Sequence, residues 1–221
     1  MRRNQPIAVL AGTPVDTRMG MALLKKAGLA GVPFPLSEDP RAQTEFQLRP
    51  SGEKQAAAEA VLRAAMEAGC SGALVYCNSL SAAVDFPRLS DKLKLPVVTP
   101  MDIYRRVAAA YRSLGVVAAN AQGLAGIERT LLAANPRLEL RGACALPAVL
   151  SVEAGEPPEE LVERHRLAEL ANWFQGCGAE ALLLGCTHFP YFKAALAART
   201  GLPLLDPDEE MLKLLGACQK P

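Results

Sequence analysis

The sequence predicts an α/β fold with two similar lobes, each a parallel sheet flanked by helices. Strand-length apolar runs alternate with helical patterns along almost the whole chain, as in doubly wound proteins. The strand runs are continuously apolar, which sheets covered on both faces require. Half of the 221 residues are hydrophobic and 21% are charged, so a full core can form. We expect residues 1–98 and 207–221 to form the first lobe and residues 99–206 the second.

The expected elements follow this alternation. Apolar runs predict strands at 7–11, 73–76, 95–98, 114–119, 181–185 and 202–205, and residues 142–152 are expected to be extended. Helical patterns cover 18–27, 51–68, 81–93, 102–111, 123–133, 158–174, 191–199 and the segment from 208 onward. The pair Gly69-Cys70 precedes one cysteine-bearing strand and Gly176-Cys177 precedes another. This short echo supports two related lobes.

Charge and cysteine usage exclude several classes of protein. The 24 basic and 23 acidic side chains leave a net charge of +1, which gives no electrostatic case for nucleic acid or membrane partners. No apolar run reaches the length of a membrane span, and the basic start at residues 1–6 leads into a strand rather than a signal sequence. We therefore expect a cytoplasmic protein. Six unclustered cysteines and only two histidines predict free thiols and no metal site.

Two cysteines stand directly after apolar runs in the two halves of the chain. Cys77 follows residues 73–76 and Cys186 follows residues 181–185. Ligands bind at the carboxyl ends of parallel strands, so both thiols are expected at a binding edge. A lone cysteine is more often a small buried hydrophobe, but polar residues follow both of these: Asn78, Ser79, Thr187 and His188. The other four cysteines lack such followers and are expected to be structural.

Paired thiols suit the inversion of a carbon that bears a weakly acidic proton. Such an inversion needs a base on one face and an acid on the other, and a thiol can serve as either. Each cysteine precedes an expected helix start, where backbone N–H groups favour a thiolate and bind carboxylates. We expect Asn78, Ser79 and Thr187 to bind the carboxylate and amine of a small amino-acid substrate. His188 is expected to accept or relay the proton of Cys186.

The motifs around both cysteines resemble those of cofactor-independent racemases. Residues 75–79, Val-Tyr-Cys-Asn-Ser, resemble the first cysteine motif of glutamate and aspartate racemases. Residues 184–190, Leu-Gly-Cys-Thr-His-Phe-Pro, closely resemble the second motif of glutamate racemases, whereas aspartate racemases usually carry glutamate at the histidine position. The resemblance implies two flavodoxin-like lobes, an active site between them, no cofactor and a two-base mechanism with opposed thiols.

A third resemblance concerns Glu153. The stretch from Cys144 to residues 152–155 resembles the segment of glutamate racemases that ends in a glutamate near the second cysteine. We therefore expect Glu153 to orient His188, since catalytic imidazoles commonly need a carboxylate partner. The alternative is a solvated glutamate at a strand end.

The start of the chain departs from the family pattern. Glutamate racemases carry Asp-Ser-Gly after the first strand, and here Ala11 occupies the aspartate position. Asp16 either replaces that catalytic aspartate or caps the helix that begins nearby. Gly12 and Thr13 are expected to contact substrate. Asn120, after the strand at 114–119, either faces the site or caps the following loop.

The expected function is racemisation of an acidic amino acid, with glutamate ahead of aspartate because of His188. Within the same superfamily, hydantoin racemisation or a maleate-type isomerisation is the alternative. A binding protein that holds an amino acid without turnover is the alternative from a different class. The resemblance is also compatible with a homodimer.

Overall fold

The computed structural model describes residues 5–218. Residues 1–4 of the basic start at 1–6, and residues 219–221 at the end of the expected first lobe, lie outside the described residues. The chain divides into two compact units. One comprises Met1–Ile103 and Pro207–Pro221, and the other Tyr104–Asp206. Helix α6 (Pro100–Ala110) crosses this division. Among the helices in the described part of the chain, none is long and apolar enough to cross a membrane.

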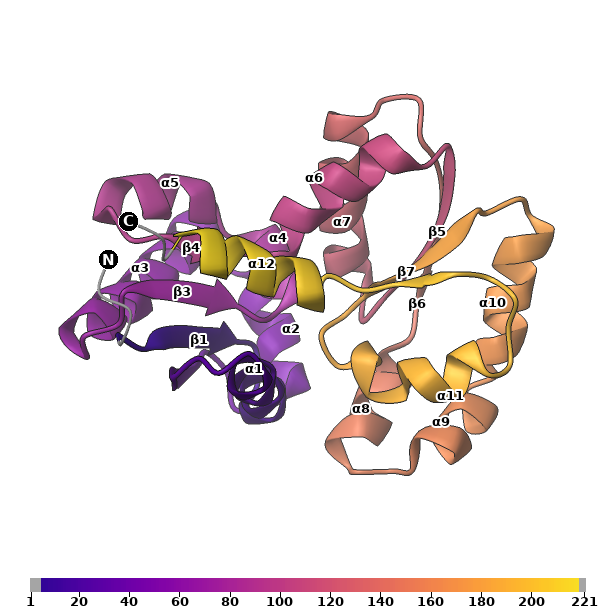
Figure 1. Ribbon diagram of the computed structural model, residues 1–221, viewed down its shortest axis with the longest axis horizontal. Helices are drawn as coiled ribbons and strands as arrows, with labels where there is room; N and C mark the ends of the chain where they lie inside the picture. Colours follow the sequence, from indigo (N-terminus) through magenta and orange to yellow (C-terminus); the bar gives the residue numbers. More distant parts are fainter. Residues whose placement is uncertain (1–4, 219–221) are drawn as a thin grey trace. The chain divides into compact units, whose positions relative to one another are not determined.

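The first unit is built on a parallel sheet with strand order β2-β1-β3-β4. Helices α1 and α12 pack against it, α1 on β1 and β2 and α12 on β3 and β4 (Figure 1). The chain returns to this sheet at its end, where the Tyr76 hydroxyl donates a hydrogen bond to Asp208 Oδ2 over 2.9 Å. Its elements are β1 (Ile7–Ala11), α1 (Pro14–Lys26), β2 (Gly31–Pro35), α2 (Pro40–Leu48), α3 (Ser51–Glu67), β3 (Gly72–Val75), α4 (Asn78–Ala83), α5 (Phe86–Leu93), β4 (Val97–Val98) and α12 (Asp208–Cys218).

The second unit repeats this arrangement with strand order β6-β5-β7-β8, again parallel. A Cβ added at Gly115 on β5 would meet Phe174 of α10, and one added at Gly185 on β7 would meet Ile127 of α7. Because Gly115 pairs with Leu182, three residues before Gly185, the two glycines face opposite sides of the sheet and so do these helices. Its elements are β5 (Ser113–Ala118), α7 (Ala121–Ala134), β6 (Glu139–Cys144), α8 (Leu146–Glu153), α9 (Pro158–Arg164), α10 (Leu167–Gly176), β7 (Ala181–Gly185), η1 (Phe189–Phe192), α11 (Lys193–Ala197) and β8 (Leu204–Leu205).

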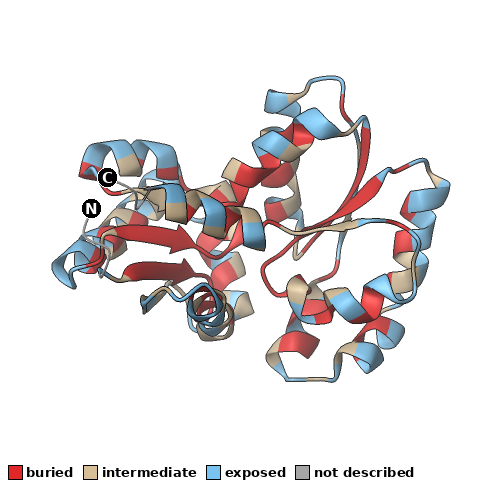
Figure 2. Ribbon diagram, viewed as in Figure 1, coloured by how far each residue is buried: buried red, intermediate tan, exposed pale blue. Residues whose placement is uncertain are grey.

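The core of each unit lies along its central strands. Every residue of β1, β3, β5 and β7 is buried, whereas the outer strands β2 and β6 are partly exposed (Figure 2). Continuous apolar runs at the sheet centre are what two covered faces demand. The predicted fold class, two α/β lobes with parallel sheets flanked by helices, is therefore confirmed.

The internal repeat exists, but in a different register from the Gly-Cys echo. Gly69 and Gly178 both have positive φ, 80° and 87°, and each ends a helix the same number of residues before its cysteine. Glycine adopts this left-handed conformation at helix ends without a Cβ penalty. Gly178 is thus the structural counterpart of Gly69. The sequence comparison, which matched Gly176 with Gly69, was wrong by two residues.

Several expected elements differ in the structure. Residues 146–152 of the segment expected to be extended, 142–152, lie in helix α8, which follows strand β6. The expected helix at 158–174 breaks at Arg166, whose φ of 52° is left-handed. The expected helix at 81–93 is replaced by α4 and α5, and Asp85 caps α5 by accepting a hydrogen bond from the N–H of Arg88 at 3.1 Å. Strand β2 and helix α2 were not expected at all; the two prolines of β2 are tolerated because it is an edge strand.

Candidate active site

The cysteines occupy equivalent positions in the two sheets. In each sheet the chain adds its second strand on one side of the first and its later strands on the other side. The strand order therefore switches between β1 and β3 in one sheet and between β5 and β7 in the other. Ligands of such sheets bind at the carboxyl ends of the strands at this switch point. Cys77 follows β3 and Cys186 follows β7. Both thiols therefore lie where the topology of their own unit creates a binding edge.

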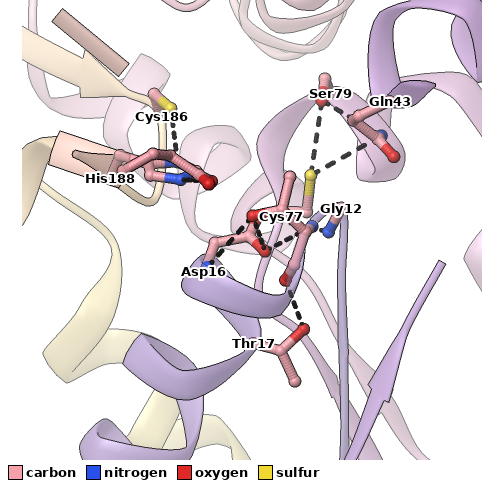
Figure 3. Close-up of polar contacts among 10 residues, drawn as sticks. Gly12, Asp16, Thr17, Gln43, Cys77, Ser79, Cys186 and His188 are labelled. Atoms are coloured by element: carbon pink, nitrogen blue, oxygen red, sulfur yellow. Dashed lines mark hydrogen bonds and ion pairs between the residues drawn. The ribbon is translucent and has the colours of Figure 1, made fainter. Parts of the chain in front are cut away.

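Cys77 is a buried thiol with neutral polar neighbours. It is the residue before α4, and only 4% of it is exposed. Its Sγ lies 3.4 Å from Ser79 Oγ and 3.9 Å from Gln43 Nε2 (Figure 3). Ser81 Oγ donates to the Cys77 carbonyl at 2.7 Å and fixes the start of α4. Asn78, which is 3% exposed, follows as the first residue of this helix.

Asp16 caps the first turn of α1. Its Oδ1 accepts the N–H of Thr13 at 2.7 Å. Its Oδ2 accepts the N–H of Gly12 at 3.2 Å (Figure 3). In return Thr13 Oγ1 accepts the N–H of Asp16 at 3.3 Å, which completes a capping box. The capping alternative is therefore present in the structure, and a part for Asp16 in the reaction stays a prediction. The N–H groups of Gly12 and Thr13, both expected to contact substrate, donate to this carboxylate.

Cys186, His188 and Glu153 form a chain of contacts in the second unit. Cys186 Sγ lies 3.6 Å from His188 Nδ1, and His188 Nε2 lies 2.8 Å from Glu153 Oε1. Figure 3 shows Cys186 and His188 side by side at the end of β7. Because an ionised carboxylate only accepts hydrogen bonds, an ionised Glu153 selects the tautomer with the hydrogen on Nε2, which leaves the Nδ1 lone pair facing the thiol. The ring can thus take the proton of Cys186, and the carboxylate can stabilise the imidazolium that results.

Burial strengthens this chain of contacts. The His188 side chain is 5% exposed and that of Glu153 17%. Glu153 is the last residue of α8, where the helix dipole disfavours a negative charge. The contact with His188 is therefore a favourable interaction that helps to compensate for a carboxylate at this position. The alternative of a solvated glutamate at a strand end is wrong, because Glu153 lies on a helix and contacts His188.

The remaining candidates differ in their surroundings. Thr187 is 2% exposed and lies between Cys186 and His188. Asn120 caps α7, with Oδ1 accepting the N–H of Gly123 at 2.9 Å, so the capping alternative is again present. Asn120 still follows β5 at the switch point of its sheet. Roles for Asn78, Ser79, Thr187 and Asn120 in substrate binding stay predictions.

Sequence reasoning missed Gln43 and Ser37. Gln43 lies on α2, a helix that was not expected, and its side chain bridges Ser37 and the Cys77 region. Ser37 lies just after β2. The Asp39-Pro40 pair was the available signal, since a capping aspartate followed by proline is typical of a helix start.

The other cysteines have different environments. Burial raises the pKa of Cys70, which precedes β3 and is 6% exposed. Cys144 is an exposed residue, but partial burial of its thiol and the nearby Glu128 carboxylate raise its pKa. The Cys218 side chain lies outside the described residues. Within residues 5–218, no group of three or more His, Cys, Asp or Glu side chains is placed to hold a metal ion.

Comparison with solved structures places this fold among known racemases. Glutamate racemase from Francisella tularensis in complex with D-glutamate superposes with a TM-score of 0.74 at 18% identity, covering 97% of this chain and 80% of that one. Glutamate racemase from Thermus thermophilus in complex with β-chloro-D-alanine gives 0.70 at 23% identity, with 97% and 80% coverage. An aspartate racemase homologue from Pyrococcus horikoshii gives 0.65 at 15% identity, with 98% and 100% coverage.

Sequence comparison gives the family. A glutamate racemase from Thermus thermophilus is 34% identical over 147 residues, which are 64% of this chain and 52% of the relative. One from Limosilactobacillus reuteri is 29% identical over 145 residues, 63% of this chain and 54% of the relative. The matched region thus spans about half the length of these curated relatives. The Asp/Glu/Hydantoin racemase model matches residues 7–215, and the chain therefore belongs to that family.

Proposed function

We propose that this protein is a cofactor-independent racemase of an acidic amino acid, with glutamate as the preferred substrate. One observation carries the proposal: Cys77 and Cys186 follow equivalent strands in two sheets with the same strand order. Duplicated topology that delivers one thiol per unit suits a reaction that needs two proton-transfer groups. The family membership supports this reading.

In the proposed reaction one thiolate removes the α-proton while the other thiol waits on the opposite face of the carbon. The first sulfur gains the proton, and the electron pair of the broken C–H bond stays on the substrate as a carbanion. The second thiol then donates its proton to the other face and becomes a thiolate. The product is the mirror-image amino acid, and the two sulfurs have exchanged protonation states.

His188 and Glu153 support the Cys186 half of this exchange. Before turnover in the direction that needs a Cys186 thiolate, Nδ1 takes the proton from Sγ, across the observed 3.6 Å. The Glu153 carboxylate, 2.8 Å from Nε2, stabilises the imidazolium. In the opposite direction Cys186 begins as the thiol and donates. This arrangement lets a single side chain act as base and as acid in alternate directions.

Glutamate is preferred over aspartate for two reasons. His188 follows Cys-Thr in this chain, as in the glutamate racemase motif. The curated relatives are glutamate racemases, and one of the similar structures holds D-glutamate. We propose that Asn78, Ser79 and Thr187 bind the α-carboxylate and amine, together with Gly12, Thr13 and Asn120. A cytoplasmic location and a homodimer, each suggested by the sequence, belong to the same proposal.

A different carbon acid is the second candidate, and Ala11 favours it. This buried residue ends β1 where glutamate racemases carry an aspartate, and the nearby Asp16 carboxylate caps α1. A changed first-strand end changes the pocket beside Cys77. Hydantoins or maleate are then the substrates to try, and a protein that binds an amino acid without turnover is the last alternative.

Proton NMR in D2O tests the proposal. The α-proton signals of L- and D-glutamate and of L- and D-aspartate are followed with the wild-type protein. Loss of the glutamate signal from both enantiomers, faster than that of aspartate, is the expected result. Exchange with aspartate alone would overturn the substrate assignment. No exchange with any of the four would overturn the proposed activity and direct the search to hydantoins, maleate or simple binding.

A further inference from the structure

Gln43 is a buried amide that links three separate segments around Cys77. It lies in the first turns of α2, and only 5% of it is exposed. Its Nε2 lies 3.4 Å from Ser79 Oγ and 3.9 Å from Cys77 Sγ, within hydrogen-bonding range for sulfur. Its Oε1 accepts a hydrogen bond from Ser37 Oγ at 2.9 Å. Figure 3 shows Gln43, Ser79 and Cys77 pointing toward one another from α2, α4 and the end of β3.

The local structure holds this amide in one orientation. Asp39 caps α2 through the N–H of Ala42 at 2.8 Å, which fixes the turn that carries Gln43. The Ser37 hydroxyl occupies the carbonyl end of the amide, so the N–H₂ end is directed at Cys77 and Ser79. Gln47 Nε2 donates to the Gln43 carbonyl at 3.0 Å and stiffens the same stretch of helix.

Gly12 leaves the space that Gln43 occupies. A Cβ at Gly12 would lie 2.9 Å from both Cγ and Cδ of Gln43 and 3.2 Å from Cys77 Sγ. The glycine backbone, the amide side chain and the thiol therefore pack directly on one another. The close approach explains why glycine suits the position after β1, independently of any contact with substrate.

We propose that Gln43 is the positioning residue of Cys77, holding its sulfur in place and donating a hydrogen bond that favours the thiolate. A donor aimed at a group stabilises the anionic form of that group over the neutral form. Ser79 and Ser37 are neutral, and the titratable side chain from α1 in this region is Asp16, whose carboxylate is bound by the N–H groups of Gly12 and Thr13. Helix α4 has only six residues, so the amide supplements a weak helix terminus.

The inference rests on the proposed function, because a thiolate at Cys77 matters for removing a proton from a substrate. The side chains that act on the two thiols differ in chemistry. Cys186 has a titratable partner in His188, whereas Cys77 has a fixed neutral donor in Gln43. Gln43 would thus supply the Cys77 thiolate with a donated hydrogen bond, whereas His188 supplies Cys186 with a proton acceptor.

The test measures the reactivity of Cys77 without any substrate. Iodoacetamide alkylates a thiolate: a sulfur–carbon bond forms while the carbon–iodine bond breaks and iodide leaves. The rate at Cys77 is followed against pH by mass spectrometry of the full-length protein, with Cys186 as the reference in the same molecule. Gln43→Leu is compared with Gln47→Leu, which removes a buried glutamine one turn along the same helix whose side chain donates to the Gln43 backbone carbonyl rather than to the sulfur.

In Gln43→Leu the pH midpoint of Cys77 alkylation is expected to rise by about 0.7 unit, a fivefold loss of thiolate that matches a typical net hydrogen bond. Gln47→Leu and the Cys186 profile should not move. Should Gln43→Leu fail to fold, Gln43→Met keeps the side-chain length without a hydrogen-bond donor or a charge, and it should raise the midpoint in the same way. An unchanged midpoint, or a change confined to the plateau rate, would overturn the role in favouring the thiolate.

The outcome is separable from that of the proposed function. A shifted midpoint together with no α-proton exchange would uphold the role of Gln43 and overturn the racemase. Exchange at the wild-type rate in Gln43→Leu, with an unshifted midpoint, would uphold the racemase and overturn the role of Gln43.

Discussion

Replacing Glu153 with glutamine should slow racemisation while leaving the fold intact. The change keeps the size and hydrogen-bonding shape of the side chain but removes the negative charge that faces His188 Nε2 at 2.8 Å. The imidazolium that forms when Nδ1 takes the Cys186 proton would then lose its counter-charge. The effect should therefore fall on the reaction rather than on stability.

The magnitude follows from the geometry of this pair. A hydrogen bond to a charged group stabilises a structure by about 1–2 kcal/mol more than a hydrogen bond between two neutral groups. The His188 and Glu153 side chains are 5% and 17% exposed, so solvent screens the pair only partly. A loss of about 1–2 kcal/mol from the transition state corresponds to a roughly five- to thirtyfold slower reaction. Because the two enantiomers have equal free energies, kcat/KM should fall by the same factor in both directions.

The assay is racemisation of L- and D-glutamate followed by circular dichroism, with Glu156→Gln as the matched control. Glu156 lies just after α8 and pairs with Arg164 at 2.7 Å, away from the contacts of His188. This control should stay within about twofold of the wild type, because the Glu156 carboxylate pairs with Arg164 rather than with His188. A wild-type rate in Glu153→Gln, or an equal loss in Glu156→Gln, would refute the reasoning.

Three further predictions concern stability. Tyr76→Phe removes the hydrogen bond to Asp208 and should lower the free energy of unfolding by about 1 kcal/mol in urea denaturation; an unchanged midpoint would contradict this. Gly185→Ala places a Cβ 2.6 Å from Ile127 Cδ1 and should lower the free energy of unfolding by about 1–3 kcal/mol. A stability equal to that of the wild type would contradict this and would show that α7 can shift to make room. Backbone N–H groups, that of Arg112 foremost, lower the pKa of Glu180, so its stabilising contribution is present above the unfolded-state pKa and is lost as pH falls through the folded-state value. Glu180→Gln should therefore show a smaller drop in Tm than wild type on acidification from about pH 5 to pH 3, and parallel curves would argue against it.

Local motifs predicted where the two candidate thiols lie because the information is contiguous in the chain. Cys77 with Asn78 and Ser79, and Cys186 with Thr187 and His188, each lie in one short stretch after a buried strand. Continuous apolar runs also gave the central strands, since burial on both faces leaves no polar alternation. The fold class and the two thiol positions followed from these patterns alone.

Contacts between distant segments could not be read in the same way. Gln43 meets Cys77 only because α2 packs on α4, and α2 itself was not expected. Residues 146–153 carry an apolar composition that fits a strand as well as a short buried helix, and length did not separate the two. The helix breaks at Arg166 because this one residue has a left-handed backbone conformation. Such a conformation is uncommon for residues other than glycine, so the sequence did not predict it.

Capping produced ambiguity of another kind. Aspartate and asparagine near a helix start suit both a cap and a catalytic or binding role, because each uses the same side-chain oxygen atoms. The structure shows Asp16 and Asn120 accepting N–H groups of their own helices. Sequence alone left both alternatives open for good physical reason.

The most direct test of the two-thiol mechanism compares four cysteine variants in the racemisation assay. Cys77→Ser and Cys186→Ser remove the proposed proton-transfer groups, whereas Cys70→Ser and Cys177→Ser change the cysteines that precede the same two strands. We predict that each of the first pair lowers the rate by at least about a hundredfold with the fold unchanged, and that the second pair stays near wild type. Racemisation near the wild-type rate in either Cys77→Ser or Cys186→Ser would contradict the account.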